Sequence, residues 1–152
     1  MQKITPFLWF NNNAEDAANF YVSVFKNSKI LNVMRYGDAG PGPKGAVMLV
    51  NFELDGGTFT ALNGNADFPF SHAVSLVVHC DDQAEIDHYW QALTADGGSE
   101  VACGWLKDKF GFSWQITPSN IGELIRTPQQ MQAMMTMKKL DIAALEAAGA
   151  SH

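Results

Sequence analysis

The same order of predicted secondary-structure elements occurs twice along the 152-residue chain, and this internal repeat limits the possible folds more than any other feature. In the first half, an apolar, β-prone segment is followed by three asparagines and by a stretch with apolar residues at helical spacing. An alternating strand, a loop rich in glycine and proline, and two strands around an Asp55-Gly56 hairpin complete this half. The predicted elements occupy residues 4–10, 14–25, 28–37 and 46–64. The first half is therefore predicted to be β-α-β-β-β.

The second half repeats this order. It begins with the strand-like segment HAVSLVVHC, residues 72–80, and continues with an amphipathic helix between an Asp-rich start and a Gly-Gly end. Strands are predicted around SEVACGW and FGFSWQITP, with KDK as the turn between them. Because the repeated unit is long and contains one helix, the sequence predicts two similar βαβββ modules rather than a solenoid of short units.

We expect a single α+β domain over residues 1–152, in which the two βαβββ modules form a curved mixed sheet around a cavity. Module one covers about residues 1–66 and module two about residues 67–120. Residues 121–152 are predicted to form a helical tail outside the repeat. Its apolar stripe is expected to pack within the chain or against a second subunit, and consists of Met131, Met134, Met135 and Leu140.

Charge and composition exclude several classes of partner. The formal net charge is −6 and the sequence contains no cluster of basic residues that could bind a phosphate backbone, so we expect no nucleic-acid partner. No segment has the length of a membrane span or the pattern of a signal peptide, so no membrane partner is expected. With only Cys80 and Cys103 present, we expect a reduced, cytoplasmic protein without a structural disulfide.

Alternation along two strands of the second half separates an apolar face from a polar one. In FSWQITP, one face carries Phe112, Trp114 and Ile116 and should contact the helices. The other face carries Ser113, Gln115 and Thr117. By the same alternation, Ser75 and His79 share a face of the preceding strand. The polar faces are predicted to line the cavity.

Two βαβββ units resemble the vicinal oxygen chelate superfamily, which includes glyoxalase I, the bleomycin-resistance proteins and the extradiol dioxygenases. The segments ITPFLWF, AEDAANFYVSVF, GPGPKG, FELDGG, ALNG, CDDQAEIDHYW and CGWLKDKFGFSWQITP are similar to the PhnB-like family. Its members often carry the label 3-demethylubiquinone-9 3-methyltransferase. The resemblance covers nearly the whole chain, including the tail MKKLDIAALEAA.

This resemblance implies where metal ligands would lie. Carried over by the motif around each strand, the superfamily's four ligand positions fall at Pro6 or its neighbour Thr5, Ala61, Ser75 and Gln115. Residues 57–61 (GTFTA) are aligned with residues 111–115 (GFSWQ), which places Asn63, two residues past Ala61, on the polar face of its strand. None of these is a histidine or a carboxylate, the side chains that divalent transition metals prefer together with thiolate. We therefore expect no metal and no cofactor, and what remains of the superfamily's site is a pocket.

The residues predicted to contact a ligand are Asn63, Ser75, His79, Trp105 and Gln115. Each has a plainer alternative. Asn63 could end its strand in a turn, His79 could be a hydrogen-bonded structural residue rather than a base, and Trp105 could belong to the core.

Other polar residues favour structural roles. His72 and His88 are expected to be exposed to solvent, and Cys103 to pack as a small apolar group rather than to act as a nucleophile. Asp108 and Lys109 are expected to form a turn with solvated charges, with a pocket role for Asp108 as the alternative. No catalytic residue is assigned.

The hypothesis favoured by these residues is a metal-independent protein that binds a small organic molecule and forms a homodimer. The alternative is an enzyme of the same superfamily, either glyoxalase- or dioxygenase-like or a methyltransferase as the family label claims. The sequence argues against a methyltransferase, because the chain lacks the strand, Gly-rich turn and helix with a following acidic residue that hold a nucleotide-like cofactor. Whether any reaction is catalysed stays open.

Overall fold

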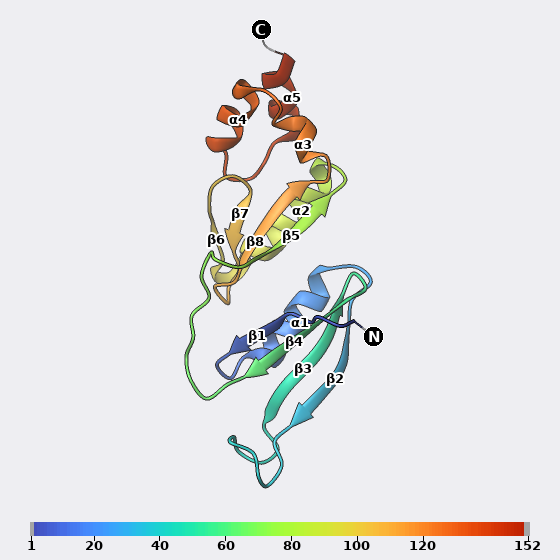
Figure 1. Cartoon of the computed structure of the whole chain (residues 1–152), viewed down its shortest axis with the longest axis vertical. Helices are drawn as coiled ribbons and strands as arrows, with labels where there is room; N and C mark the ends of the chain where they lie inside the picture. Colours follow the sequence, from blue (N-terminus) through green and yellow to red (C-terminus); the bar gives the residue numbers. More distant parts are fainter. Residues whose placement is uncertain (1, 151–152) are drawn as a thin grey trace. The chain divides into compact units, whose positions relative to one another are not determined.

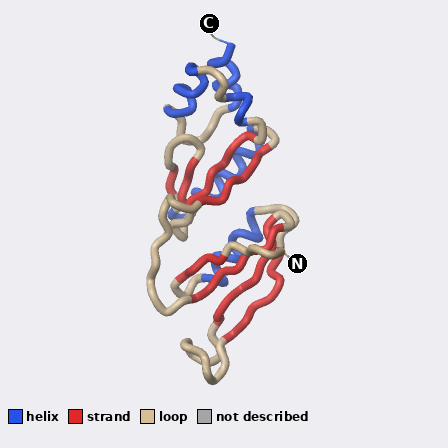
Figure 2. The backbone as a smooth tube through the Cα atoms, in the orientation of Figure 1, coloured by secondary structure: helices blue, strands red, loops and turns tan. Residues whose placement is uncertain are grey.

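The computed structural model describes residues 2–150, and these residues form two compact units, with the division between Pro69 and Phe70. Each unit is an open four-stranded sheet with a helix packed on one face (Figures 1 and 2). They correspond to the two predicted modules, and the second unit also carries the tail. The prediction that modules and tail together form one domain stays a prediction.

Module one follows the predicted order β-α-β-β-β. Its elements are β1 (Phe7–Phe10), α1 (Ala14–Val24), β2 (Lys29–Arg35), β3 (Val47–Leu54) and β4 (Gly57–Asn63). In the sheet the strand order is β1-β4-β3-β2, with β1 parallel to β4 and the remaining pairs antiparallel. The β3–β4 hairpin turns at Asp55 and Gly56, which both have positive φ angles, of 47° and 83°. This is the two-residue turn predicted from the Asp-Gly pair.

Module two repeats the same topology. Its elements are β5 (Ser75–Cys80), α2 (Gln83–Thr94), a short 3-10 helix η1 (Ala95–Gly97), β6 (Ser99–Glu100), β7 (Trp105–Lys107) and β8 (Ser113–Pro118). The strand order β5-β8-β7-β6 matches that of module one element for element, with β5 parallel to β8. The internal repeat in the sequence is therefore a repeat of two βαβββ modules.

The strand predicted around SEVACGW differs from the observed structure. It is divided into the short strands β6 and β7, because Cys103 and Gly104 have φ angles of 60° and 85° and turn the chain between them. An extended strand cannot pass through two successive left-handed residues. The last hairpin of module two is consequently shorter than its counterpart in module one.

The apolar face predicted for β8 is confirmed. Phe112, Trp114 and Ile116 are at most 2% exposed, and β8 packs against α2. The buried residues on α2 are Ile86, Tyr89, Trp90 and Leu93. Asp82 caps this helix by accepting a hydrogen bond from the backbone N–H of Glu85, as expected from the Asp-rich start. Alternation along β8 thus fixes which face of the sheet the helix covers.

The tail contains three helices where one or two were expected: α3 (Ile121–Leu124), α4 (Pro128–Met135) and α5 (Ile142–Ala150). Within the predicted apolar stripe, only Leu140 is fully buried, whereas Met131 and Met135 are 37% and 64% exposed. The segment before α5 is held by backbone hydrogen bonds of 2.8 Å from Cys103 N to Met137 O and from Gly104 N to Lys138 O. The tail is therefore fastened to module two at the turn between β6 and β7.

Among residues 2–150, no helix has the length and apolar character needed to cross a membrane.

Candidate functional site

The side chains of Ser75 and Gln115 meet on the face of the module-two sheet opposite α2. Gln115 Nε2 donates a 3.0 Å hydrogen bond to Ser75 Oγ. Trp105 is the register partner of Gln115 on the neighbouring strand β7. The structure therefore brings three of the predicted ligand-binding residues together on one surface, which we call the polar face.

Ser113, predicted on this face, and His72, which was not predicted to take part in it, extend the polar face. His72 Nδ1 lies 2.9 Å from Ser113 Oγ, and the imidazole ring stands edge-on to Trp105 with 5.9 Å between ring centroids. His72 is exposed, as predicted, yet it is held in place by these two contacts. A local sequence motif cannot predict a hydrogen bond between residues 41 positions apart, so this contact is seen only in the three-dimensional structure.

His79 lies further along the polar face. It pairs in register with Thr117 rather than with Gln115, and its side chain is exposed. The sequence thus placed His79 on the correct strand face. Its role in ligand binding or proton transfer stays a prediction.

Asn63 and Ala61 lie on the other side of their sheet from the position expected. Ala61 is completely buried and pairs in register with Leu8 and Val50, the buried residues that face α1. The Asn63 side chain points the same way, because its Oδ1 accepts a 2.9 Å hydrogen bond from the backbone N–H of Ala14 at the start of α1. Both residues therefore face the helix, not the polar surface of the strand.

The cause of this error is a shift of one residue in the alignment of the two modules. Successive strand residues point to opposite faces, so one residue of slippage exchanges the faces completely. The residues of β4 that face away from α1, as Gln115 faces away from α2, are Thr60 and Leu62. Thr60 Oγ1 donates a 2.6 Å hydrogen bond to Asn51 Oδ1, and Asn51 Nδ2 donates to Asn32 Oδ1 at 2.9 Å. This polar row across module one was not predicted.

The residues at the implied metal positions do not fit a divalent metal. Pro6 and Ala61 have no side-chain donor atom, and Thr60, which replaces Ala61 on the correct face, offers only a neutral hydroxyl. Ser75 and Gln115 are hydrogen-bonded to each other. Nowhere in residues 2–150 do three histidine, cysteine, aspartate or glutamate side chains gather closely enough to hold a metal ion.

Asp108 is not the solvated turn residue that was expected. It is 2% exposed, and its Oδ1 accepts hydrogen bonds from the backbone N–H groups of Phe110 and Phe112 at 2.8 and 3.1 Å. Its Oδ2 accepts one from Trp114 Nε1 at 2.8 Å. A carboxylate with three donors is a structural centre for the β7–β8 turn, and it does not reach the polar face.

Neither cysteine forms a disulfide, as predicted. Cys80 is completely buried, and burial together with the nearby carboxylates of Glu85, Asp81 and Asp82 raises the pKa of its thiol to about 12. A thiol with so high a pKa is not a nucleophile at neutral pH. Cys80 is therefore a packing residue.

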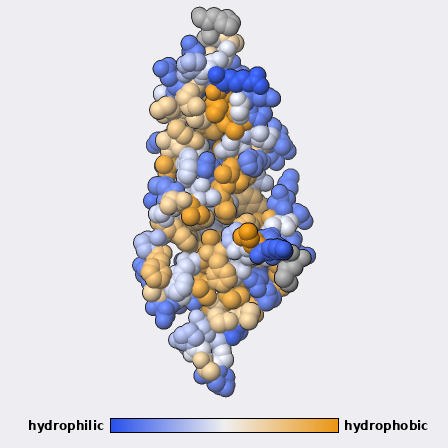
Figure 3. All heavy atoms as spheres, in the orientation of Figure 1, coloured by the Kyte–Doolittle hydropathy of each residue, from blue (hydrophilic) through white to orange (hydrophobic). Residues whose placement is uncertain are grey.

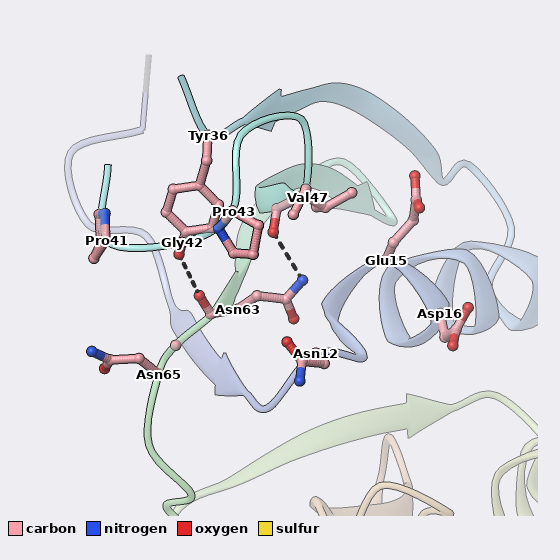
Figure 4. A pocket seen from close by; sticks show the side chains of 12 residues that line it. Asn12, Glu15, Asp16, Tyr36, Pro41, Gly42, Pro43, Val47, Asn63 and Asn65 are labelled. Carbon is pink, nitrogen blue, oxygen red and sulfur yellow. Dashed lines mark hydrogen bonds between the residues drawn. The ribbon is translucent and has the colours of Figure 1, made fainter. Parts of the chain in front are cut away.

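A pocket of about 320 Å³ lies in module one at the N-terminal end of α1 (Figure 4). One wall is the first turn of α1 together with Asn12, two residues before the helix, another is the loop after β2, and the third is the end of β4. The lining residues are Asn12, Glu15, Asp16, Tyr36, Pro41, Gly42, Pro43, Ala46, Val47, Asn63, Gly64 and Asn65. Asn63, the remaining predicted ligand-binding residue, belongs to this pocket and not to the polar face.

A family model described as 3-demethylubiquinone-9 3-methyltransferase matches residues 2–117. The chain belongs to this family. The PhnB protein of Bacillus cereus, provisionally described as 3-demethylubiquinone-9 3-methyltransferase, is 40% identical, with 77% of this chain and 99% of that chain covered and a TM-score of 0.70. Family membership places the chain in the vicinal oxygen chelate superfamily, as the sequence resemblance implied.

Two more distant structures share the fold. A Pseudomonas aeruginosa protein is 22% identical over 78% of this chain and 98% of its own, with a TM-score of 0.62. A fosfomycin resistance protein of Mesorhizobium loti is 13% identical over 84% and 100%, with a TM-score of 0.56. A search among curated proteins finds no match. The family match ends at residue 117, so the tail lies outside it, contrary to the expected extent of the resemblance.

Proposed function

We propose that this family member binds a small organic molecule on the polar face of module two without the help of a metal ion. The observation that carries this proposal is the hydrogen-bonded pair of Ser75 and Gln115 beside Trp105. These two residues stand at positions where the superfamily resemblance implies metal ligands. In their place is a neutral, oriented pair of polar groups next to an aromatic side chain.

The chemistry of the polar face favours a neutral ligand with an apolar part. Gln115 donates to Ser75 through Nε2, and its Oε1 accepts no hydrogen bond from residues 2–150. That oxygen can accept a hydrogen bond from a ligand hydroxyl or amide. Trp105 offers a large flat surface on which an apolar ring or chain can pack. We infer that this ligand is bound in the cytoplasm and that the protein that binds it is a homodimer.

Native mass spectrometry of the freshly purified protein tests this proposal, because a retained ligand appears as a defined mass increment. Titration of that ligand into the stripped protein should quench or shift tryptophan fluorescence. Gln115→Leu should weaken binding about ten-fold, since a lost hydrogen bond of about 1.4 kcal/mol corresponds to that factor. Gln129→Leu, an exposed glutamine on α4, is the matched control. Equal affinity of both variants would refute the site.

We further predict that the protein contains no specific divalent metal. Elemental analysis should find far less than one equivalent per chain, and a chelator should leave the melting temperature unchanged, because a metal bound only to the folded state would stabilise it. About one equivalent of metal, lost on chelation together with several degrees of stability, would favour the glyoxalase-like alternative.

Methyl transfer is the second candidate, since the family description names it. This candidate predicts saturable binding of S-adenosylmethionine by isothermal titration calorimetry. The two sheets offer no Gly-rich strand-turn-helix of the kind that holds such a nucleotide-like cofactor. We therefore expect no heat of binding.

A further inference from the structure

We propose that the pocket of module one is a second binding site, selective for a small organic cation such as a primary ammonium or a guanidinium compound. It is formed entirely within module one, and it does not depend on the function proposed for the polar face. Its volume of about 320 Å³ is at the lower end of the range for small-molecule pockets, roughly 300–1,000 Å³.

The wall of the pocket opposite the helix is held in place by hydrogen bonds and close packing. Tyr36 N donates to Ala46 O at 2.9 Å and Gly45 N donates to Tyr36 O at 2.8 Å, which closes the loop between β2 and β3. The Tyr36 hydroxyl donates a 2.9 Å hydrogen bond to Asn63 O and so ties the loop to the end of β4. A Cβ atom on Gly42 would lie 2.4 Å from the Tyr36 ring, so glycine lets the loop pack directly on it. The pocket thus exists before any ligand arrives.

The charge of the pocket is entirely negative. Glu15 and Asp16 are the charged residues among those that line it, and neither makes a hydrogen bond or ion pair with any of residues 2–150. Two nearby basic residues, one at the end of β2 and one in the loop that follows it, are engaged elsewhere: Arg35 donates to Gly45 O at 3.0 Å, and Lys44 pairs with Asp38 at 3.0 Å. The two carboxylates lie in the first turn of α1, where they offset the partial positive charge of the helix N-terminus, and they give the pocket a net negative charge that favours a positively charged ligand.

The remaining lining groups suit an organic cation better than a metal ion. The side chains of Asn12 and Asn65 line the pocket together with Tyr36 and Pro43 (Figure 4). An ammonium or guanidinium group only donates hydrogen bonds, and amide and carboxylate oxygens accept them. The tyrosine and proline surfaces can pack against the carbon skeleton of the same ligand. A bare metal ion would leave this apolar wall unused.

Three probes of similar shape test the proposal: phenethylammonium, 2-phenylethanol and phenylacetate. In ¹H–¹⁵N NMR titrations of the full chain, phenethylammonium should shift the signals of Glu15, Gly64 and Asn65. It should bind at least about ten-fold more tightly than the alcohol, as expected for a charge-assisted contact, while phenylacetate should not bind. Added salt should weaken the binding of the ammonium compound, because Glu15 is partly exposed and Asp16 is exposed.

The double variant Glu15→Gln/Asp16→Asn should abolish the preference for the ammonium probe. Asp67→Asn, which removes an exposed carboxylate of module one outside the pocket, should leave it intact. Thermal melting of both variants establishes that they are folded. Equal binding of the ammonium compound and the alcohol, shifts elsewhere in the spectrum, or unchanged binding by the double variant would overturn the proposal. Displacement of the probe by calcium at equimolar concentration would also overturn it.

Discussion

Asp108 shows how a single buried carboxylate can organise a turn. Its two oxygens accept hydrogen bonds from two backbone N–H groups and from the Trp114 indole. The Trp114 ring is part of the buried contact with α2, so the carboxylate links the conformation of the turn to the core. A charge buried in this way is favourable only while all its donors remain in place.

Asp108→Asn is therefore expected to reduce the free energy of unfolding by about 2 kcal/mol, since one amide N–H₂ must face a donor. Urea unfolding followed by tryptophan fluorescence and circular dichroism measures this loss. Glu146→Gln, the same chemical change at an exposed position, should change stability by less than about 0.5 kcal/mol. Similar values for the two variants would show that the Asp108 charge has no structural role.

At the same scale, the sequence was sufficient for some residues and not for others. The alternation of large apolar and small polar residues in β8 correctly assigned Trp114 and Gln115 to opposite faces. For β4 the alternation of Thr58, Phe59 and Thr60 indicated the correct faces, but the alignment of the two modules at Gly57 and Gly111 is one residue out and misplaced Ala61. The burial of Asp108 could not be predicted, because a turn with Lys on both sides of Asp is usually solvated.

At the scale of elements, the attachment of the tail depends on Gly104. A Cβ atom at this residue would lie 3.0 Å from Leu140 Cδ1 and 3.1 Å from Ile116 O. The φ angle of Gly104, 85°, is also rare for any residue that carries a side chain. Gly104 O also accepts a 2.8 Å hydrogen bond from Ile116 N. One glycine thus lies between β8 on one side and the tail on the other.

Gly104→Ala and Gly111→Ala separate backbone strain from crowding. Both glycines have a φ of 85°, but nothing lies within 4 Å of a Cβ atom at Gly111. We expect Gly111→Ala to cost about 1 kcal/mol of stability through strain alone. Gly104→Ala should cost about 1–3 kcal/mol more, because Leu140 must also move. Denaturant unfolding measures the stability of the two variants. Equal losses of stability would mean that the tail moves to accommodate the added methyl group at no cost.

The elements themselves were well predicted. Helix caps, the Asp-Gly turn and strand alternation are local signals, and they located both modules. The division between β6 and β7 was missed because Cys103 is not a residue that usually adopts a positive φ. The contact between the tail and the turn at Cys103 and Gly104 was missed because it joins segments distant in sequence.

At the scale of the whole molecule, apolar side chains remain on the surface (Figure 3). Phe7 and Val77 are 57% and 41% exposed, and Met135 on α4 is 64% exposed. Met131, one turn before Met135 on the same face of α4, is 37% exposed, and neighbouring exposed apolar side chains are typical of an interface. Since most soluble oligomers are symmetric dimers, we expect two copies to associate.

Light scattering after gel filtration at micromolar concentration should give twice the monomer mass of 16.6 kDa. If α4 takes part in the interface, Met131→Glu/Met135→Glu should yield a monomer, because burying a charge without a partner is costly. Gln129→Glu on the same helix is the control. A monomeric wild-type protein would contradict the prediction of a dimer.

The cap on α1 has a consequence for how the chain folds during synthesis. The Ala14 N–H at the start of this helix is satisfied by a side chain 49 residues later in the chain. As the polypeptide leaves the ribosome, the helix emerges well before Asn63, and until then the Ala14 N–H has only water as its hydrogen-bond partner. Module one therefore completes its structure late, only after its last strand has emerged, and nascent chains ending before Asn63 should remain sensitive to protease.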